Sequence, residues 1–174
     1  VISNMVSGIV ITYMRPFKVG DRIKMGEFLG NVIEKTPLVT RIKTSKNEVI
    51  TIPNANIMTS QTVNYTSSAE AYGLVLYSVV TMGYDTPWRK VHEMLIEAGL
   101  NTPKVLQDPK PVVLQIALDD FYVQYQINVY TKEANEMANI YSELNKNIQD
   151  IFNREGFELL SPHYRAQRDG STVT

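Results

Sequence analysis

The chain opens with fourteen residues that carry no charge, and this run ends at the dipeptide Arg15-Pro16. Proline lacks a backbone N–H and disfavours helical angles at the residue before it. Residues 1–14 are therefore predicted to form a helix that ends near Met14. A helix needs about 20 apolar residues to span a bilayer, so we expect this run to be the end of a longer hydrophobic segment. It lacks the basic region and cleavage pattern of a signal peptide.

The charge of the chain changes sign along its length. Residues 15–66 hold eight Lys or Arg and four Asp or Glu, a net charge of +4, whereas residues 67–174 hold nine and fourteen, a net charge of −5. A basic segment directly after an apolar one is typical of the cytoplasmic flank of a membrane helix. Chance variation between two small domains explains the charges equally well.

Residues 19–66 are predicted to form five short strands joined by tight turns, because runs of Val, Ile and Thr alternate with polar residues between turn-forming segments. A turn at Gly20-Asp21 is expected to open the first strand. Pro53-Asn54 is expected to end the fourth strand and to begin a short helical turn. The expected strands are 21–25, 31–36, 38–44, 49–52 and 62–65. Their spacing predicts a small barrel or curled sheet.

The pattern changes after a polar connector over 67–71. Long strands are predicted at 72–82, 111–118 and 121–131, with a shorter one at 157–160, and helices at 87–99 and 134–154. Asp85-Thr86-Pro87 is expected to supply a capping side chain and then a proline at the first helical position. Gly99 and Gly156 are expected to end the helices. The order β-α-β-β-α-β predicts a ferredoxin-like α+β domain.

No group of residues suggests catalysis, a metal site or a cofactor. The chain has no cysteine, and its two histidines, His92 and His163, are far apart in sequence. Asp119-Asp120 is expected to form a hairpin turn, and Gly26 and Gly30 are expected to serve turns because no phosphate-binding motif follows them. The acidic second half and the missing RNA-recognition pattern oppose nucleic-acid binding. We therefore expect neither an enzyme nor a nucleic-acid partner.

Several ordered motifs resemble the mechanosensitive channels of small conductance, the MscS-type channels. The resemblance is strong over 1–66 and looser over 67–174, where Tyr84-Asp85 precedes a helix. The motifs are Arg15-Pro-Phe-Lys-Val-Gly-Asp21, Gly30-Asn-Val32, Thr40-Arg-Ile42, Val49-Ile-Thr-Ile-Pro-Asn54 and Val63-Asn-Tyr65, with Ser3-Asn4 and Gly8 upstream.

The resemblance implies a location in the inner (plasma) membrane for the whole protein, with residues 15–174 on the cytoplasmic side. It implies that residues 1–14 are the end of a pore-lining helix, 15–66 a small five-stranded Sm-like β barrel, 67–162 a ferredoxin-like domain and 163–174 a C-terminal tail. Arg15, Pro16 and Phe17 would form the junction between membrane and cytoplasm. Asn4 and Gly8 would serve the helix as flexible or packing positions, and the residues Gly20, Asp21, Pro53 and Asn54 would hold the β domain together.

The function implied is that of one subunit of a tension-gated channel that releases ions and small osmolytes on hypo-osmotic shock. The implied partners are further copies of the chain, seven in all, and membrane lipid contacted through upstream helices. An alternative from a different class is a soluble oligomeric module that binds RNA or a regulatory ligand and has no channel activity.

Overall fold

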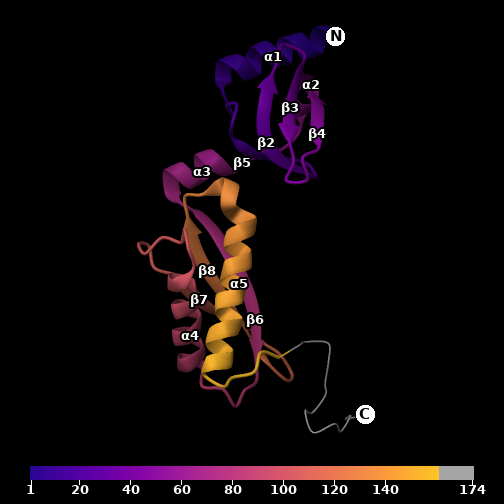
Figure 1. Cartoon of the computed structure of the whole chain (residues 1–174). Coiled ribbons are helices and arrows are strands. Elements are labelled where there is room, and N and C mark those ends of the chain that lie inside the picture. The colour runs from indigo at the N-terminus through magenta and orange to yellow at the C-terminus, as the bar shows by residue number, and fades with distance from the viewer. Residues whose placement is uncertain (161–174) are drawn as a thin grey trace. The chain divides into compact units, whose positions relative to one another are not determined.

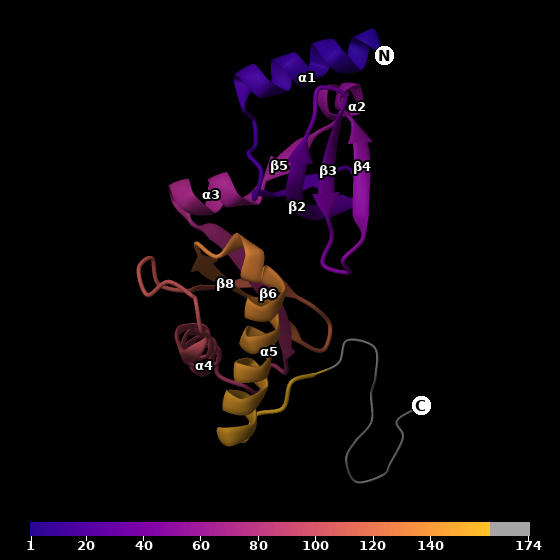
Figure 2. The same cartoon turned by 45° about the horizontal axis from the view of Figure 1, so that its top comes forward.

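The computed structural model describes residues 1–160 and divides them into two units (Figures 1 and 2). The first unit contains residues 1–74 and 132–135, and the second contains the remaining described residues. The expected tail over 163–174, including His163, lies outside the described residues.

The first unit combines a helix with an antiparallel five-stranded sheet. Helix α1 (Ile2–Met14) ends where Pro16 predicts, because Arg15 adopts a left-handed conformation with φ of 48°. The sheet has the order β4-β3-β2-β1-β5, and all five strands expected from the sequence are present. Its strands are β1 (Arg22–Met25), β2 (Phe28–Lys35), β3 (Val39–Lys43), β4 (Val49–Pro53) and β5 (Thr62–Asn64), with helix α2 (Asn54–Thr59) between the last two.

Two of the predicted turn glycines have different roles. Gly26 lies in the β1–β2 turn with φ of 55°, which glycine adopts without strain. Gly30 instead lies inside β2, where a Cβ atom would come within 2.5 Å of the carbonyl oxygen of Lys43. The prediction of a turn at Gly30 is therefore wrong, and the close approach of strand β3 explains the glycine.

The polar connector expected over 67–71 is also wrong, because these residues belong to helix α3 (Tyr65–Tyr72). Asn64 caps this helix by accepting a hydrogen bond on Oδ1 from the backbone N–H of Ser67, at 3.1 Å. The cap satisfies one of the N–H groups that a helix start leaves without a partner.

The second unit contains helices packed on a three-stranded sheet of order β6-β8-β7. Its elements are β6 (Leu74–Met82), α4 (Trp88–Asn101), β7 (Val112–Leu118), β8 (Val123–Thr131) and α5 (Met137–Arg154), with a short 3₁₀ turn η1 (Ala134–Glu136) before α5. The expected fourth strand over 157–160 is absent among the described residues. That segment makes one backbone bond to β6, from the Leu160 N–H to the Thr81 carbonyl at 3.0 Å.

The ends of α4 differ from the prediction. Pro87 precedes the helix as its N-cap instead of occupying the first turn, and no side chain caps the helix start. The helix continues past Gly99 to Asn101, and the Thr102 hydroxyl donates to the Ala98 carbonyl at 2.7 Å. A Cβ atom on Gly99 would lie 2.9 Å from Pro111, so tight packing accounts for this glycine.

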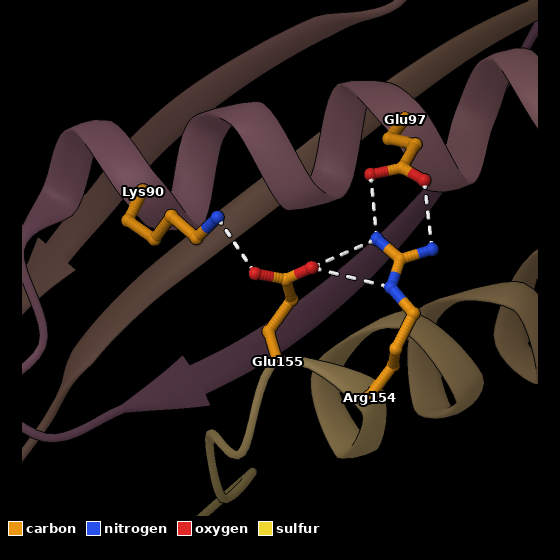
Figure 3. A network of polar contacts seen from close by, with 4 residues as sticks. All are labelled: Lys90, Glu97, Arg154 and Glu155. Carbon is orange, nitrogen blue, oxygen red and sulfur yellow. Dashed lines mark hydrogen bonds and ion pairs between the residues drawn. The ribbon is translucent and has the colours of Figure 1, made fainter.

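Helix α5 presents one apolar stripe to the core, and its end is joined to α4 by a network of charges (Figure 3). Arg154 makes two parallel hydrogen bonds to the carboxylate of Glu97, both at 3.0 Å. Glu155 accepts from Lys90 at 2.8 Å and from Arg154 at 3.0 Å. The bond from Lys90, followed by that from Arg154, lowers the pKa of Glu155. As predicted, Gly156 follows the end of α5 and has φ of 76°.

His92 lies on the inner side of α4 between two aromatic rings. It makes edge-to-face contacts with Trp88 and Tyr125, at centroid distances of 5.2 and 5.8 Å. Its Nε2 atom is buried and has no hydrogen-bond partner within residues 1–160. Burial disfavours the charged imidazolium and lowers the pKa of His92.

We therefore expect the second unit to lose stability in mild acid. Because the pKa of His92 is lower in the folded than in the unfolded state, the unfolded state binds the proton more readily. The stability contributed by neutral His92 is complete above the unfolded-state pKa of 6.5 and is lost as the pH falls through its lower folded-state pKa. Urea unfolding between about pH 8 and about pH 5 should show a shallower decline for His92→Gln than for the parent.

Glu93→Gln serves as the matched control, because it removes a titratable group from the exposed side of the same helix. The expectation fails if the parent and His92→Gln show the same dependence on pH.

Candidate functional site

The residues singled out by sequence gather in the first unit, where α1 lies beside α2 (Figures 1 and 2). Asn4 and Gly8 lie on the inner side of α1, whereas Pro53 and Asn54 lie where β4 passes into α2. Pro53 ends its strand and directly precedes the helix, as the sequence predicts. These four residues form the site named here the helix seat.

Asn54 is the centre of the helix seat. Its exposed fraction is 1%, and its backbone and side chain make four hydrogen bonds. The backbone N–H donates to Leu38, and Nδ2 donates to the carbonyls of Thr36 and Pro37 at 2.9 and 3.0 Å. Oδ1 accepts from the buried hydroxyl of Thr40 at 3.0 Å. Asn54 therefore fixes the β2–β3 turn against the start of α2.

Asn4 connects α1 to the same place. Its Oδ1 accepts a hydrogen bond from the backbone N–H of Ala55 at 3.0 Å. This N–H belongs to the first turn of α2, where backbone donors have no partner inside the helix. Asn4 thus caps α2 from a helix more than fifty residues away in sequence.

Gly8 is the point of closest approach between α1 and the β2–β3 turn. A Cβ atom there would collide with the backbone carbonyl of Pro37 and would lie 2.7 Å from Nδ2 of Asn54. One turn further along α1, Ile11 is 1% exposed and joins the core formed by the β strands. By contrast, Val6 and Ile9 are 56% and 67% exposed, so they do not pack on the β strands of the described chain.

The chain turns sharply after α1. Pro16 follows the left-handed Arg15, and Phe17 then enters the core with an exposed fraction of 1%. Nζ of Lys35 donates to the Phe17 carbonyl at 3.2 Å and lies 5.0 Å from the centre of its ring. Burial, together with the nearby charge of Arg15, lowers the pKa of Lys35.

Asp21 fixes the turn that leads into β1. Its Oδ2 accepts from the backbone N–H of Lys18 at 2.9 Å and from Nδ2 of Asn64 at 2.8 Å. Asn64 also donates to the Pro16 carbonyl at 3.1 Å. Gly20 adopts a positive φ of 98°, as expected of a turn glycine. This turn therefore ties the segment after α1 to strand β5.

A groove of about 640 Å³ opens between α1 and the β2–β3 turn, beside the helix seat. Ile9 and Tyr13 form part of its apolar wall, and Arg15 and Lys35 bring two positive charges to it. Neither cation forms an ion pair among the described residues. The groove therefore combines an apolar wall with two positively charged side chains.

Sequence reasoning missed Thr40, Pro37 and Ile11. Thr40 lies within a recognised motif, but only the fold shows that its hydroxyl faces Asn54. Ile11 follows Asn4 and Gly8 by seven and three residues, a helical spacing that could have indicated the inner face.

We expect Gly8→Ala to weaken the attachment of α1. At an exposed helical site, replacing glycine by alanine would stabilise the helix by about 1 kcal/mol. Here the added methyl collides with backbone, and overpacking costs about 1–3 kcal/mol. Hydrogen exchange over residues 2–14 should become faster in Gly8→Ala. In Ser3→Ala, the exposed control on the same helix, exchange should stay equal or become slower; acceleration in both would refute the packing explanation.

We expect Asn54→Asp to destabilise the first unit by about 3 kcal/mol or more, because it buries a charge and removes both side-chain donors. Asn56→Asp makes the same change at an exposed position in α2 and should cost about 0.5 kcal/mol or less. Urea denaturation measures both, and a loss in Asn54→Asp no larger than in Asn56→Asp would contradict the assigned hydrogen bonds.

No helix among residues 1–160 is long and apolar enough to cross a bilayer. The described residues also contain no cluster of side chains suited to a metal ion.

Comparisons with known proteins agree on one family. Residues 1–67 match the family described as "Mechanosensitive ion channel, beta-domain", and residues 77–159 match "Mechanosensitive ion channel MscS, C-terminal". An uncharacterized MscS family protein of Haemophilus influenzae is 28% identical over 160 residues, covering 91% of this chain and 14% of that protein. The mechanosensitive channel MscK of Escherichia coli is 27% identical over 138 residues, covering 79% of this chain and 12% of that protein.

A solved structure shows the same fold. The closed-state crystal structure of Helicobacter pylori MscS matches with a TM-score of 0.79 at 20% identity, covering 95% of this chain and 66% of that one. The chain spans about one seventh of the length of the two relatives named above. The two matched regions together account for most of the chain, which belongs to the family of MscS-type mechanosensitive channels.

Proposed function

We propose that the chain is part of a subunit of a tension-gated channel that releases ions and small osmolytes on hypo-osmotic shock. The observation that carries the proposal is the succession of both MscS-type domains directly after an uncharged helix. Because the family consists of ion channels, its membership supports a role for this chain other than that of an enzyme.

Residues 1–14 are proposed to be the end of the pore-lining helix, with Asn4 and Gly8 as packing positions and not flexible ones. The contact of Gly8 with the backbone of Pro37 supports this choice. The side of α1 that faces away from the sheet is apolar and exposed at Ile2, Val6 and Ile9. Such a surface suits lipid or neighbouring helices.

Arg15, Pro16 and Phe17 are proposed to form the junction between membrane and cytoplasm. Arg15 would lie among lipid headgroups, as its charge beside the groove, which forms no ion pair within residues 1–160, supports. Phe17 would anchor the chain in the β-domain core. On this assignment, residues 15–174 lie on the cytoplasmic side of the inner (plasma) membrane, and upstream helices make the main contacts with lipid.

The β domain over 15–66 is proposed to be Sm-like, with Gly20, Asp21, Pro53 and Asn54 holding it together. Support comes from the order helix, four strands, short helix and fifth strand. The domain over 67–162 is proposed to be ferredoxin-like. The order β6-β8-β7 and the bond between residue 160 and β6 leave a place for a fourth strand at that edge.

The partner is proposed to be the chain itself, in a homo-oligomer. In the first sheet, β4 and β5 each have one edge without a strand partner among the described residues. Sheet edges without a partner strand can pair with a strand of another chain. If β4 of one copy pairs with β5 of the next, the copies associate head to tail. Such a series forms a ring when the rotation between neighbouring copies closes on itself. Exposed Val49 and Val63 lie on these edges. The number seven comes only from the family resemblance.

Pressure-clamp recording on membrane patches containing the intact gene product tests the channel function. We expect stepwise currents that appear with suction and stop on release, because tension favours the conformation with the larger area in the membrane. Asn54→Asp should shift the suction threshold or abolish the currents, because it disrupts the seat of α1, whereas the control Asn56→Asp should not.

Protein present in the membrane but silent up to patch rupture would refute the proposal. The result would favour the second candidate, an oligomeric module that binds RNA or a regulatory ligand.

A further inference from the structure

A short segment between β8 and α5 is grouped with the first unit, although these two elements belong to the second. The first unit contains residues 132–135 in addition to residues 1–74, so the chain enters it twice. We name residues 132–135 the return segment. Ala134 within it is only 5% exposed. The return segment is therefore packed in place and is not a free loop between β8 and α5.

One pair of side chains joins the return segment to the first sheet. Oδ1 of Asn135 accepts a hydrogen bond from Nδ2 of Asn31 on β2 at 2.6 Å, across 104 residues of sequence. Asn31 also accepts on its own Oδ1 from Nη1 of Arg22 at 3.1 Å. An amide both donates and accepts, whereas an ionised carboxylate only accepts and an apolar side chain does neither. Asn31 uses both abilities, so an amide suits its two partners where other side chains of this size would not.

The residues on either side of the return segment are held by Lys104, which follows α4. The hydroxyl of Thr131 donates to the Lys104 carbonyl at 2.8 Å, and the carboxylate of Glu136 forms an ion pair with the Lys104 ammonium at 3.3 Å. These three residues all belong to the second unit. A change in the second unit that moves the segment around Lys104 would therefore move Asn135 through the covalent chain.

Asn31 leads on to the turn over residues 18–22, named here the junction turn. Besides its bond from Arg22, its Nδ2 donates to the Gly20 carbonyl at 3.5 Å. The next residue of β2 holds the same turn through its backbone. The Gly20 N–H donates to the Val32 carbonyl at 2.7 Å, and the Val32 N–H donates to the Asp21 carbonyl at 2.9 Å. Strand β2 therefore fixes the junction turn at the position of Asn31.

The junction turn in its turn holds the chain where it leaves α1. The carboxylate of Asp21 accepts from Asn64, and Asn64 donates to the Pro16 carbonyl at 3.1 Å. Pro16 lies two residues after the end of α1. A connected series of hydrogen bonds and adjacent residues thus runs from Asn135 to the end of the N-terminal helix.

We propose that Asn31 and Asn135 are positioning residues for the channel, because they link the return segment to the junction turn that holds the end of α1. Loss of their hydrogen bond would let the junction turn move independently of the return segment, and so would change the free energy of displacing α1. Energetic coupling passes through connected hydrogen bonds and packed side chains of this kind. The inference rests on the proposed channel function and adds a place where the second unit influences the tension needed for opening.

Hydrogen exchange in the intact gene product tests the contact. Asn135→Ala removes the acceptor, and we expect exchange over residues 16–22 to become about fivefold faster, the effect of losing one hydrogen bond. Asn135→Asp keeps an oxygen at the position of Oδ1 and should exchange like the parent. Asn153→Ala removes the same kind of amide from an exposed position on α5. It is the matched control and should leave exchange over residues 16–22 unchanged.

Pressure-clamp recording with the same variants tests the role in gating. We expect Asn31→Ala and Asn135→Ala to shift the suction threshold in the same direction, and Asn135→Asp and Asn153→Ala to leave it unchanged. The double variant Asn31→Ala/Asn135→Ala should shift the threshold no further than Asn31→Ala alone, because the two residues act through one shared bond. Two unrelated local losses of structure would instead add.

The outcomes separate this proposal from the one on which it rests. Equal exchange over residues 16–22 in Asn135→Ala and Asn153→Ala overturns the positioning role. Additive threshold shifts, or an unchanged threshold in channels that do open, overturn the role in gating. A parent protein that stays silent up to patch rupture overturns the proposed function and the role in gating with it, whereas faster exchange in Asn135→Ala would still support the contact with the junction turn.

Discussion

The hydrogen bonds of Asn54 hold together the elements on which the first unit depends. One buried side chain joins the β2–β3 turn, strand β3 and the start of α2, and so positions the surface that receives α1. Because the side chains of Asn54 and Thr40 are each 1% exposed, water has little access to replace the hydrogen bonds of Asn54. The core below it is small, with Ile11 and Phe17 entering from the N-terminal segment. Polar geometry therefore determines where the helix lies, and apolar burial holds it there.

Sequence patterns predicted the elements well because local chemistry decides them. Proline at residue 16 ends α1 in any context, and alternation in 19–66 yields the five strands in their observed order. The motif residues of the β domain could likewise be placed on a turn and at the end of a strand. Glycine was the main source of error. Gly30 and Gly99 exist because another chain segment passes close by, and that information lies outside the local sequence.

The other features that the sequence did not predict have different causes. Helix α3 forms over a polar stretch that Asn64 caps, although its composition indicated a connector. The inner face of α1 is chosen by Asn4 and Gly8, so the larger Val6 and Ile9 remain exposed against the usual preference of apolar side chains. The segment over 157–160 has strand-like residues but only one backbone bond to the sheet. The cap of α3 is local, whereas in the other two cases a partner distant in sequence decides the outcome, as tertiary context commonly overrides propensity.

The contact of Gly8 with the backbone of Pro37 has a mechanical consequence. Side chains that interdigitate let a helix slide in small steps, because each rotamer change preserves part of the contact. A backbone pressed against backbone has no such adjustable layer, and hydrogen bonds weaken steeply once their geometry is lost. We therefore expect the joint between α1 and the β domain to resist small displacements and to give way in one step. A helix held in this way would shift between two positions under a graded pull and would not pass through a continuum of positions.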